Sequence, residues 1–376
     1  MDVSFHSSIG EIAAAEWNAL VEDEQPFLQY AFIAALENNG CIGGDLDWYA
    51  HHICVRDNGQ LIGAMLLFEK HNTHGEFVFD HAWADAWHRA GLRYYPKLVT
   101  ATPYTPASGQ RMLALKGRET EVFPVLLNAA LEFAKNNDFS SFHCLFPTQP
   151  QQEFMQQQGL YTRHDCQYHW HNNNYENFDE FLARLSAKKR KNIRQERRKV
   201  RDAGITLRVL NGVTASETDW AIFTEFYRNI YQRKWGMPVF NEGFFADVAV
   251  ALKEQVILVM ADLDGVAVAG SLMYKSQHTL FGRHWGCAKK HDSLHFEACY
   301  YQGIEICIEH KLKLFEPGAQ GEHKVARGFL PTITRSSHWI SAEDFRPAIA
   351  RYCEHEKINI EKYIQHMNDR LPYKSA

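Results

Sequence analysis

The chain has 376 residues, of which 45% are hydrophobic and 13% aromatic, and its formal net charge is −5. This composition excludes an intrinsically disordered chain, which has few aromatic residues and a strong net charge, and the length favours two or three domains. No stretch approaches the roughly 18 apolar residues of a membrane span, and the N-terminal residues lack the pattern of a signal peptide. The eight widely spaced cysteines are typical of reduced thiols. We therefore expect a cytoplasmic protein with no integral membrane segment.

Two stretches of the chain share a strand–turn–strand pattern. Residues 48–68 contain two β-like runs separated by the Asn-Gly dipeptide at 58–59, and residues 256–274 contain two runs separated by the Asp-Gly dipeptide at 264–265. Both dipeptides are strong hairpin signals, because Asn, Asp and Gly tolerate the positive φ of a tight turn. Each stretch is therefore predicted to be a β-hairpin.

Two further echoes support a duplication. Residues 131–142 and 304–315 each contain a helical pattern followed by a strand-like run. Residues 79–83 and 281–285, FDHAW and FGRHW, are also alike, and we expect them on corresponding strands. Repeats of this size indicate a duplicated domain rather than a solenoid. The sequence therefore predicts an α/β (α+β) fold with mixed sheets, built as two similar lobes.

The first lobe carries an insertion that has no counterpart in the second. Three prolines and one glycine between residues 94 and 111 exclude a regular helix there. A long ordered loop inside a compact domain is usually functional. We expect Tyr104 and Arg111 from this loop, together with Asp80, to line the first-lobe side of a substrate cleft.

A strongly basic segment follows the predicted boundary between the lobes, which are residues 1–172 and 173–376. Between Lys188 and Arg201 the sequence KKRKNIRQERRKVR holds nine Lys or Arg against one Glu, so the rest of the chain is strongly acidic. We expect a basic helix over residues 186–203 that binds an anionic partner such as tRNA, the alternative being a solvated helix face. The candidate nucleic-acid or anion contacts are Lys189, Arg190, Arg194 and Arg197.

The densest group of titratable and aromatic residues lies in the second lobe. A predicted strand delivers His284, and a helix that begins near residue 294 presents Glu297 and Tyr301. The Asp-Ser pair at residues 292–293 is expected to cap that helix. The alternative is an ordinary capped helix, but so many titratable groups at one strand-to-helix junction favour a functional site.

The segment FEPGAQGEHKVARGF, residues 315–329, interleaves glycines with charged side chains. Glycines let backbone N–H groups approach a ligand closely, and Lys and Arg hold phosphate or carboxylate groups. The alternative is a polar loop stabilised by its own ion pairs. The candidate substrate contacts in and near this segment are Gln320, His323, Lys324, Arg327 and Tyr301.

Two other chemistries are disfavoured by the sequence. His164, Asp165, Cys166, His169 and His171 lie close together, but their spacing matches no standard zinc pattern. No Gly-x-Ser-x-Gly elbow marks a nucleophilic serine. We therefore predict neither a metal site nor a serine-hydrolase triad.

Several runs of the chain resemble one bacterial family. HWGC, LHFEACYYQGIE and FEPGAQGEHKVARGF in the second lobe, and FDHAWADAW, YYPK and PYTPASGQR in the first, are similar to the Fem-like N-acyltransferases, also described as peptidoglycan biosynthesis/recognition proteins. The resemblance covers nearly the whole chain. It implies two tandem lobes of the Gcn5-related N-acyltransferase (GNAT) fold.

The resemblance also implies an enzyme that transfers an acyl or aminoacyl group from a carrier-bound donor, aminoacyl-tRNA or acyl-CoA, to an amine. The acceptor would be a peptidoglycan precursor or a small molecule. The Gly-rich pyrophosphate loop of many acetyltransferases has no clean copy in the second lobe, which favours an aminoacyl or other carrier-bound donor over acetyl-CoA. The alternatives are a non-catalytic module that recognises peptidoglycan precursor or nucleic acid, and an acetyl-CoA-dependent acetyltransferase of a small amine.

Direct acyl transfer needs a base for the ammonium proton and hydrogen-bond donors for the oxyanion. It needs no covalent enzyme intermediate. The candidate catalytic residues are Glu322, Glu297, Asp292 and His284.

Overall fold

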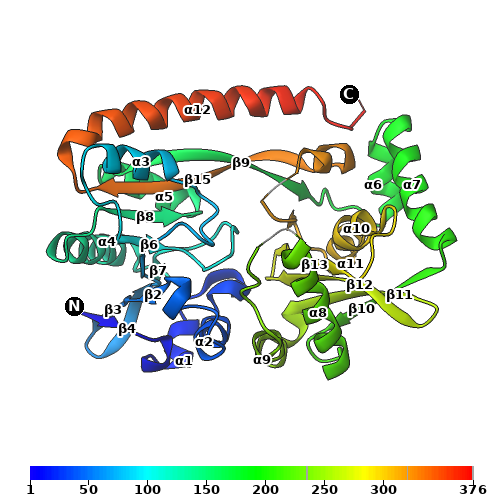
Figure 1. Cartoon of the computed structure of the whole chain (residues 1–376), viewed down its shortest axis with the longest axis horizontal. Coiled ribbons are helices and arrows are strands. Elements are labelled where there is room, and N and C mark those ends of the chain that lie inside the picture. The colour runs from blue at the N-terminus through cyan, green and yellow to red at the C-terminus, as the bar shows by residue number, and fades with distance from the viewer. Residues whose placement is uncertain (234–235, 320, 375–376) are drawn as a thin grey trace. The chain divides into compact units, whose positions relative to one another are not determined.

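The structure, a computed structural model, describes residues 1–233, 236–319 and 321–374. Helices and mixed β-sheets alternate along the chain, which confirms the predicted α/β class (Figure 1). Among the described residues, no helix is both long enough and apolar enough to cross a membrane.

The chain divides into two compact units. Unit 1 comprises Met1–Cys166 and Ile333–Tyr363, and unit 2 comprises Gln167–Thr332 and Ile364–Ala376. Unit 1 therefore contains most of the C-terminal strand and last helix, which the sequence division at 172/173 placed in the second lobe. The boundary at 172/173 therefore misplaces the C-terminal strand and helix. The sequence could not show this, because strands that pair over long sequence separations leave no local signal.

The strands of unit 1 form two sheets. They are β1 (Asp2–His6), β2 (Tyr49–Ala50), β3 (His52–Asp57), β4 (Gln60–Met65), β5 (Phe68–Lys70), β6 (Lys97–Thr100), β7 (Leu113–Ala114) and β8 (Ser141–Leu145), with parts of β9 (Tyr161–His171) and β15 (Leu330–Ile340). One sheet has the order β1-β3-β4-β7, and the other contains the order β2-β5-β6-β8-β15. β6 and β8 are parallel, and the other pairs are antiparallel.

The helices of unit 1 pack on these sheets through apolar stripes. They are α1 (Ala14–Asn18), α2 (Tyr30–Asn38), α3 (His81–Arg89), α4 (Glu119–Asn136), α5 (Gln149–Gln157) and most of α12 (Arg346–Asn368). In α4 the buried residues Val122, Leu126, Ala130 and Ala134 are spaced four apart and join the core with strands β3, β4 and β8. This spacing places them on one helix face.

The C-terminal segment belongs to unit 1 through pairing and packing. In β15, residues 336–340 pair antiparallel with β8. Ile349 and Cys353 of α12 are buried against Trp83 and Trp87 of α3. These contacts stabilise unit 1 and account for its discontinuous chain.

Unit 2 contains a sheet with the order β10-β11-β12-β13-β14-β9. Its strands are β10 (Ile205–Asn211), β11 (Val256–Leu263), β12 (Val266–Lys275), β13 (Thr279–Cys287), β14 (Leu314–Glu316) and the second half of β9. β13 and β14 are parallel, and the other pairs are antiparallel.

The helices of unit 2 include the predicted basic helix. They are α6 (Phe178–Arg184), α7 (Ala187–Asp202), α8 (Glu217–Arg233), α9 (Glu242–Leu252), α10 (Leu294–Phe296) and α11 (Gln302–Glu309), with a π-helical turn at Glu297–Tyr301 and a 3-10 helix at Glu322–Arg327. In α7, which covers the basic segment, Ile193 and Val200 are the buried residues. The helix docks by this thin stripe, so most of its cations stay at the surface.

Both predicted hairpins are present. The turns between β3 and β4 and between β11 and β12 have positive φ at Asn58 (50°), Gly59 (83°), Asp264 (52°) and Gly265 (77°). The helix–strand echo is present as well, because α4 leads into β8 and α11 leads into β14, and each of these strands has a parallel neighbour. The prediction that residues 79–83 and 281–285 lie on corresponding strands is wrong.

Residues 281–285 lie in β13, whereas the similar FDHAW sequence begins helix α3. Trp83 and Trp87, four residues apart, are both buried in unit 1. Apolar residues at this spacing share one face of a helix. Tertiary packing of this helical stripe therefore outweighs the likeness of the two short sequences.

Gly286 lets α8 lie directly on β13. A Cβ added at Gly286 would lie 2.3 Å from the carbonyl carbon of Phe226 in α8, so the helix would have to move. We expect Gly286→Ala to lower the free energy of unfolding by about 1–3 kcal/mol, as overpacking of a core does. Gly10→Ala is the control, because its Cβ meets only the hydroxyl of Ser8, at 3.2 Å. Urea denaturation of both variants tests the expectation, and equal losses would contradict it.

Candidate functional site

A pocket of about 250 Å³ lies over β13 in unit 2. It is lined by Arg283, His284 and Trp285 from β13 and by Tyr227, Ile230 and Tyr231 from α8. Of the four candidate catalytic residues, His284 lines this pocket.

A β-bulge explains why neighbouring residues share the pocket. Leu272 of β12 pairs with His284, whereas the next residue, Met273, pairs with Gly282, so Arg283 is an extra residue in β13. Consecutive side chains of a regular strand point to opposite faces. A bulge re-aims a side chain, and bulges are common beside active sites. Here the bulge brings Arg283 and His284 to the same pocket.

The pocket combines a neutral imidazole with a partly buried cation. The ring of His284 packs edge-on against Tyr227 at 5.3 Å and Phe240 at 5.0 Å. Burial, followed by the charge of Arg283, lowers the pKa of His284 to about 3, so this imidazole is neutral near pH 7. Burial also lowers the pKa of Arg283 to about 10, which still leaves it charged at that pH. A desolvated guanidinium is a strong partner for a developing negative charge.

The Gly-rich segment places its two cations inside the protein. Lys324 is buried, its Nζ donates to the carbonyl oxygen of Gly318 at 2.6 Å, and burial lowers its pKa to about 7. Arg327 is also buried and donates to Glu196 at 2.7 Å and to the hydroxyl of Tyr301 at 3.1 Å. Arg327 therefore has internal partners, while Lys324 has an amine that titrates near neutrality.

The other predicted substrate contacts of this segment differ in their exposure to solvent. His323 is exposed and forms a hydrogen bond with the hydroxyl of Tyr300 at 2.9 Å. Tyr301 is buried, and its hydroxyl donates to Glu196. Gln320 lies outside the described residues.

The three candidate carboxylates lie apart from the β13 pocket lining. Glu297 is buried and pairs with Arg197 at 3.1 Å. The side chains of Glu322 and Asp292 are 57% and 72% exposed. Asp292 pairs with Lys199 at 2.8 Å, and this hydrogen bond lowers the pKa of Asp292. Each carboxylate thus has a cationic neighbour or faces solvent.

The expected cap of the helix near residue 294 is wrong. Ser293 occupies the N-cap position with φ 65°, and its side chain makes no capping hydrogen bond. Its hydroxyl donates instead to Asp292. The helix then passes through the π-helical turn, a feature that often occurs at functional sites.

The three candidates of unit 1 are buried. The guanidinium of Arg111 donates to the carbonyl oxygens of Leu145, Gln110 and Ala107 at 2.6–2.7 Å, so it holds the predicted loop together. Tyr104 packs against Trp48 with a ring distance of 5.6 Å. Asp80 belongs to a buried charged network.

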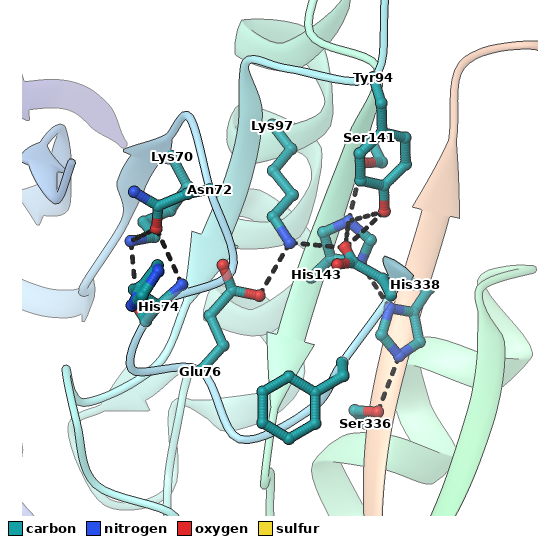
Figure 2. A network of polar contacts seen from close by, with 12 residues as sticks. Lys70, Asn72, His74, Glu76, Tyr94, Lys97, Ser141, His143, Ser336 and His338 are labelled. Carbon is teal, nitrogen blue, oxygen red and sulfur yellow. Dashed lines mark hydrogen bonds and ion pairs between the residues drawn. The ribbon is translucent and has the colours of Figure 1, made fainter. Parts of the chain in front are cut away.

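That network is centred on Lys97 (Figure 2). The Nζ of Lys97 donates to Glu76 at 2.8 Å and to Asp80 at 2.5 Å, and all three side chains are at most 3% exposed. The hydroxyl of Tyr94 donates to the same oxygen of Asp80 at 2.5 Å. The network therefore joins residues of the FDHAW and YYPK sequences.

Two buried histidines extend the network. Nδ1 of His143 lies 2.5 Å from Nδ1 of His338, and each ring also meets a serine hydroxyl, Ser141 or Ser336, at 2.7 Å (Figure 2). Burial lowers the pKa of both histidines well below the usual value, so both are neutral. One imidazole must then donate its Nδ1–H to the Nδ1 of the other. A serine hydroxyl can donate or accept, so Ser141 and Ser336 can satisfy the Nε2 atoms whichever ring is the donor.

One lysine cannot neutralise two carboxylates in a dry site. Burial raises the pKa of Glu76 to about 7, whereas Lys97 and Tyr94 hold the pKa of Asp80 below its usual value despite burial. Asp80 therefore carries the negative charge, and Glu76 takes up a proton as the pH falls towards 5. The pair Lys97–Asp80 is then nearly neutral overall.

This charge distribution predicts a pH dependence of stability. Because the folded state holds the proton of Glu76 more tightly, the stabilisation is full below about pH 4.5 and is lost as the pH rises through about 7. Relative to Glu76→Gln, which cannot titrate, the wild type is expected to lose about 2–3 kcal/mol of unfolding free energy between about pH 5 and about pH 8. Urea unfolding at both pH values measures this, with Glu132→Gln as the exposed control. A constant difference between wild type and Glu76→Gln would contradict the assignment.

The four predicted anion contacts of α7 are partly engaged. Arg197 pairs with Glu297 and Glu305, and Arg194 pairs with Asp179. Arg190 donates to the carbonyl oxygen of Leu185 at 3.2 Å, and Lys189 is half-buried. Two other arginines of α7, Arg198 and Arg201, are exposed and thus more available to bind an anion.

Sequence reasoning missed several of these residues. Tyr227 and Tyr231 are four apart in α8, a spacing that indicates a shared face but not what that face contacts. Glu76, Lys97, His143 and His338 come from distant segments, and no local pattern predicts that they meet. Lys97 and Tyr94 lie in the YYPK sequence, and its resemblance to the Fem-like family is the one sequence signal that points to these residues.

Comparisons with known proteins agree with this architecture. Residues 8–375 match the model of the FemAB-like family, described as peptidoglycan biosynthesis/recognition. Among solved structures, the chain is similar to FemX, with 12% identity and a TM-score of 0.54, over 93% of this chain and 100% of that one. No curated protein matches the chain.

Two other structures are similar. The C-terminal domain of a lysylphosphatidylglycerol synthetase candidate from Agrobacterium fabrum is 8% identical with a TM-score of 0.56, over 93% of this chain and 97% of that one. A tandem GNAT protein from the clavulanic acid biosynthesis pathway is 11% identical with a TM-score of 0.46, over 91% and 98%. The family match over nearly the whole chain confirms the resemblance read from the sequence. The chain belongs to the FemAB-like family and has a fold similar to that of FemX.

Proposed function

We propose that this protein is an N-acyltransferase that moves an acyl or aminoacyl group from a carrier-bound donor to an amine, with a peptidoglycan precursor as the acceptor class. Family membership supports the reaction class and the acceptor. The observation that carries the proposal is the bulge of β13, which presents the cation of Arg283 and the neutral ring of His284 to one pocket.

The proposed chemistry is a direct transfer. The amine nitrogen attacks the carbonyl carbon of the donor ester or thioester, a C–N bond forms, and the carbonyl oxygen becomes an oxyanion. The guanidinium of Arg283 stabilises that oxyanion. As the C–O or C–S bond breaks, the leaving group departs with the electron pair, and the amine proton must be removed.

Two groups are suited to assist this step, one by orienting the amine and one by exchanging its proton. His284 is neutral near pH 7 and accepts a hydrogen bond from the attacking amine, which orients its lone pair. Lys324 does not line the β13 pocket, but the charge of Arg283, after burial, helps to lower its pKa to about 7, so it exchanges a proton near neutral pH. Glu297, Glu322 and Asp292 are weaker candidates, because each is ion-paired or largely exposed.

The test is a transfer assay with separate donors. Purified protein is incubated with a peptidoglycan precursor that carries a free amine, and with either aminoacyl-tRNA or acetyl-CoA. We expect mass spectrometry to show a precursor enlarged by the aminoacyl or acyl mass, and the productive donor identifies the carrier. If the protein binds the precursor but forms no product with either donor, the proposed enzyme activity is wrong and the protein is a recognition module.

A further inference from the structure

A second cavity lies in unit 2, on the surface of the basic helix. It is an open groove of about 410 Å³ between α6, α7 and α11, and Figure 1 shows α6 and α7 side by side. Its lining residues are Phe178, Asp179, Leu182, Arg194, Arg197, Arg198, Arg201 and Glu305. Among the described residues, the groove and the β13 pocket have no lining residue in common.

Four arginines form one stripe along this groove. Positions 194, 197, 198 and 201 follow the spacing of a single helix face. Arg194 and Arg197 pair with Asp179 and Glu305, which also line the groove. Against two carboxylates, the four guanidinium groups leave two positive charges in excess.

The excess charge belongs to Arg198 and Arg201. Both side chains are exposed, and neither has a hydrogen-bond or ion-pair partner within the described part of the chain. They lie three residues apart on one helix face, so their planar groups reach the same ligand. Guanidinium groups match phosphate oxygens in a two-point geometry, which favours a phosphate over a single carboxylate.

The floor of the groove suits a flat ring. The guanidinium of Arg197 lies 4.6 Å from the ring centroid of Phe178 and is held there by Glu297 and Glu305. Leu182 also lines the groove, with its side chain almost fully buried. Aromatic and guanidinium faces are the surfaces on which nucleobases stack.

We propose that this groove binds a nucleotide, with its phosphate on Arg198 and Arg201 and its base against Phe178 and Arg197. The ligand is either a free nucleotide or one nucleotide of a longer RNA. The inference does not depend on the transfer reaction or on the β13 pocket.

The test measures binding of a fluorescent ADP analogue to the full chain by anisotropy, with unlabelled ADP as competitor. Arg198→Gln/Arg201→Gln is expected to weaken binding by roughly tenfold to a hundredfold, the effect of losing a charge-assisted hydrogen bond. Phe178→Leu should weaken it by less. Lys191→Gln, an exposed α7 residue outside the groove, is the control and should stay within about twofold.

Two further arms define the ligand. Inorganic phosphate should compete much more weakly than ADP, because it lacks the base. A short single-stranded RNA that competes through the same two arginines identifies RNA as the source, and its failure to compete identifies a free nucleotide. Equal affinity of the double variant and wild type for ADP, equal competition by phosphate, or RNA binding without ADP binding would overturn the proposal.

Discussion

The Lys97→Met variant is expected to lose about 3–5 kcal/mol of unfolding free energy, the cost of removing one partner from a buried ion pair. Lys97 is fully buried and is the cation that bonds both Glu76 and Asp80. Without it, both carboxylates must be protonated or remain as uncompensated charges in a dry site. Methionine keeps most of the side-chain volume, so the loss reports charge rather than a cavity.

Urea denaturation measures the loss, and two comparisons make it specific. Lys116→Met, at an exposed position, should change the unfolding free energy by less than about 0.5 kcal/mol. Lys97→Met combined with Glu76→Gln and Asp80→Asn should recover much of the stability, because no buried charge is then left without a partner. A single variant within about 1 kcal/mol of wild type would show that the network is not the electrostatic centre of unit 1.

The second large effect concerns the β13 pocket. If the proposed transfer occurs there, His284→Phe should lower kcat by roughly tenfold to a hundredfold, the effect of losing a charge-assisted hydrogen bond to the attacking amine. Phenylalanine keeps the ring contacts with Tyr227 and Phe240, so stability and KM should change little. His310→Phe, at an exposed position, is the control.

The pH profile of the same reaction separates the two proton-handling groups. With a pKa of about 3, His284 adds no titration near neutrality, whereas Lys324 should raise kcat as the pH increases through about 7. Lys324→Met should remove that rise. Activity of His284→Phe within about threefold of wild type, with the pH rise unchanged in Lys324→Met, would move the chemistry away from this pocket.

Local chemistry made much of the fold predictable. The hairpins at Asn58-Gly59 and Asp264-Gly265 follow from residues that tolerate positive φ, and the turns show those angles. The basic helix α7 and its buried Ile193 and Val200 follow from helical spacing. Each of these features depends on residues within a few positions of one another, which is the range that sequence patterns describe.

The candidate site depended on contacts that the sequence does not encode locally. A one-residue bulge in β13 decides that Arg283 and His284 share a pocket, and its cause lies in pairing with β12. Burial and partners decide that Arg111 binds backbone carbonyls and Arg197 two carboxylates, while Arg198 stays available.

From the sequence alone, the chain is a duplicated α/β protein of the Fem-like type with one basic helix, because turn chemistry, periodicity and extended motifs act locally. Only the tertiary structure decided which charges are buried together, such as Lys97 with Asp80, and which strand completes unit 1. The physical reason is that electrostatic pairing and strand pairing act through space. Residues that are far apart in the chain therefore determine the protonation and availability of each functional group.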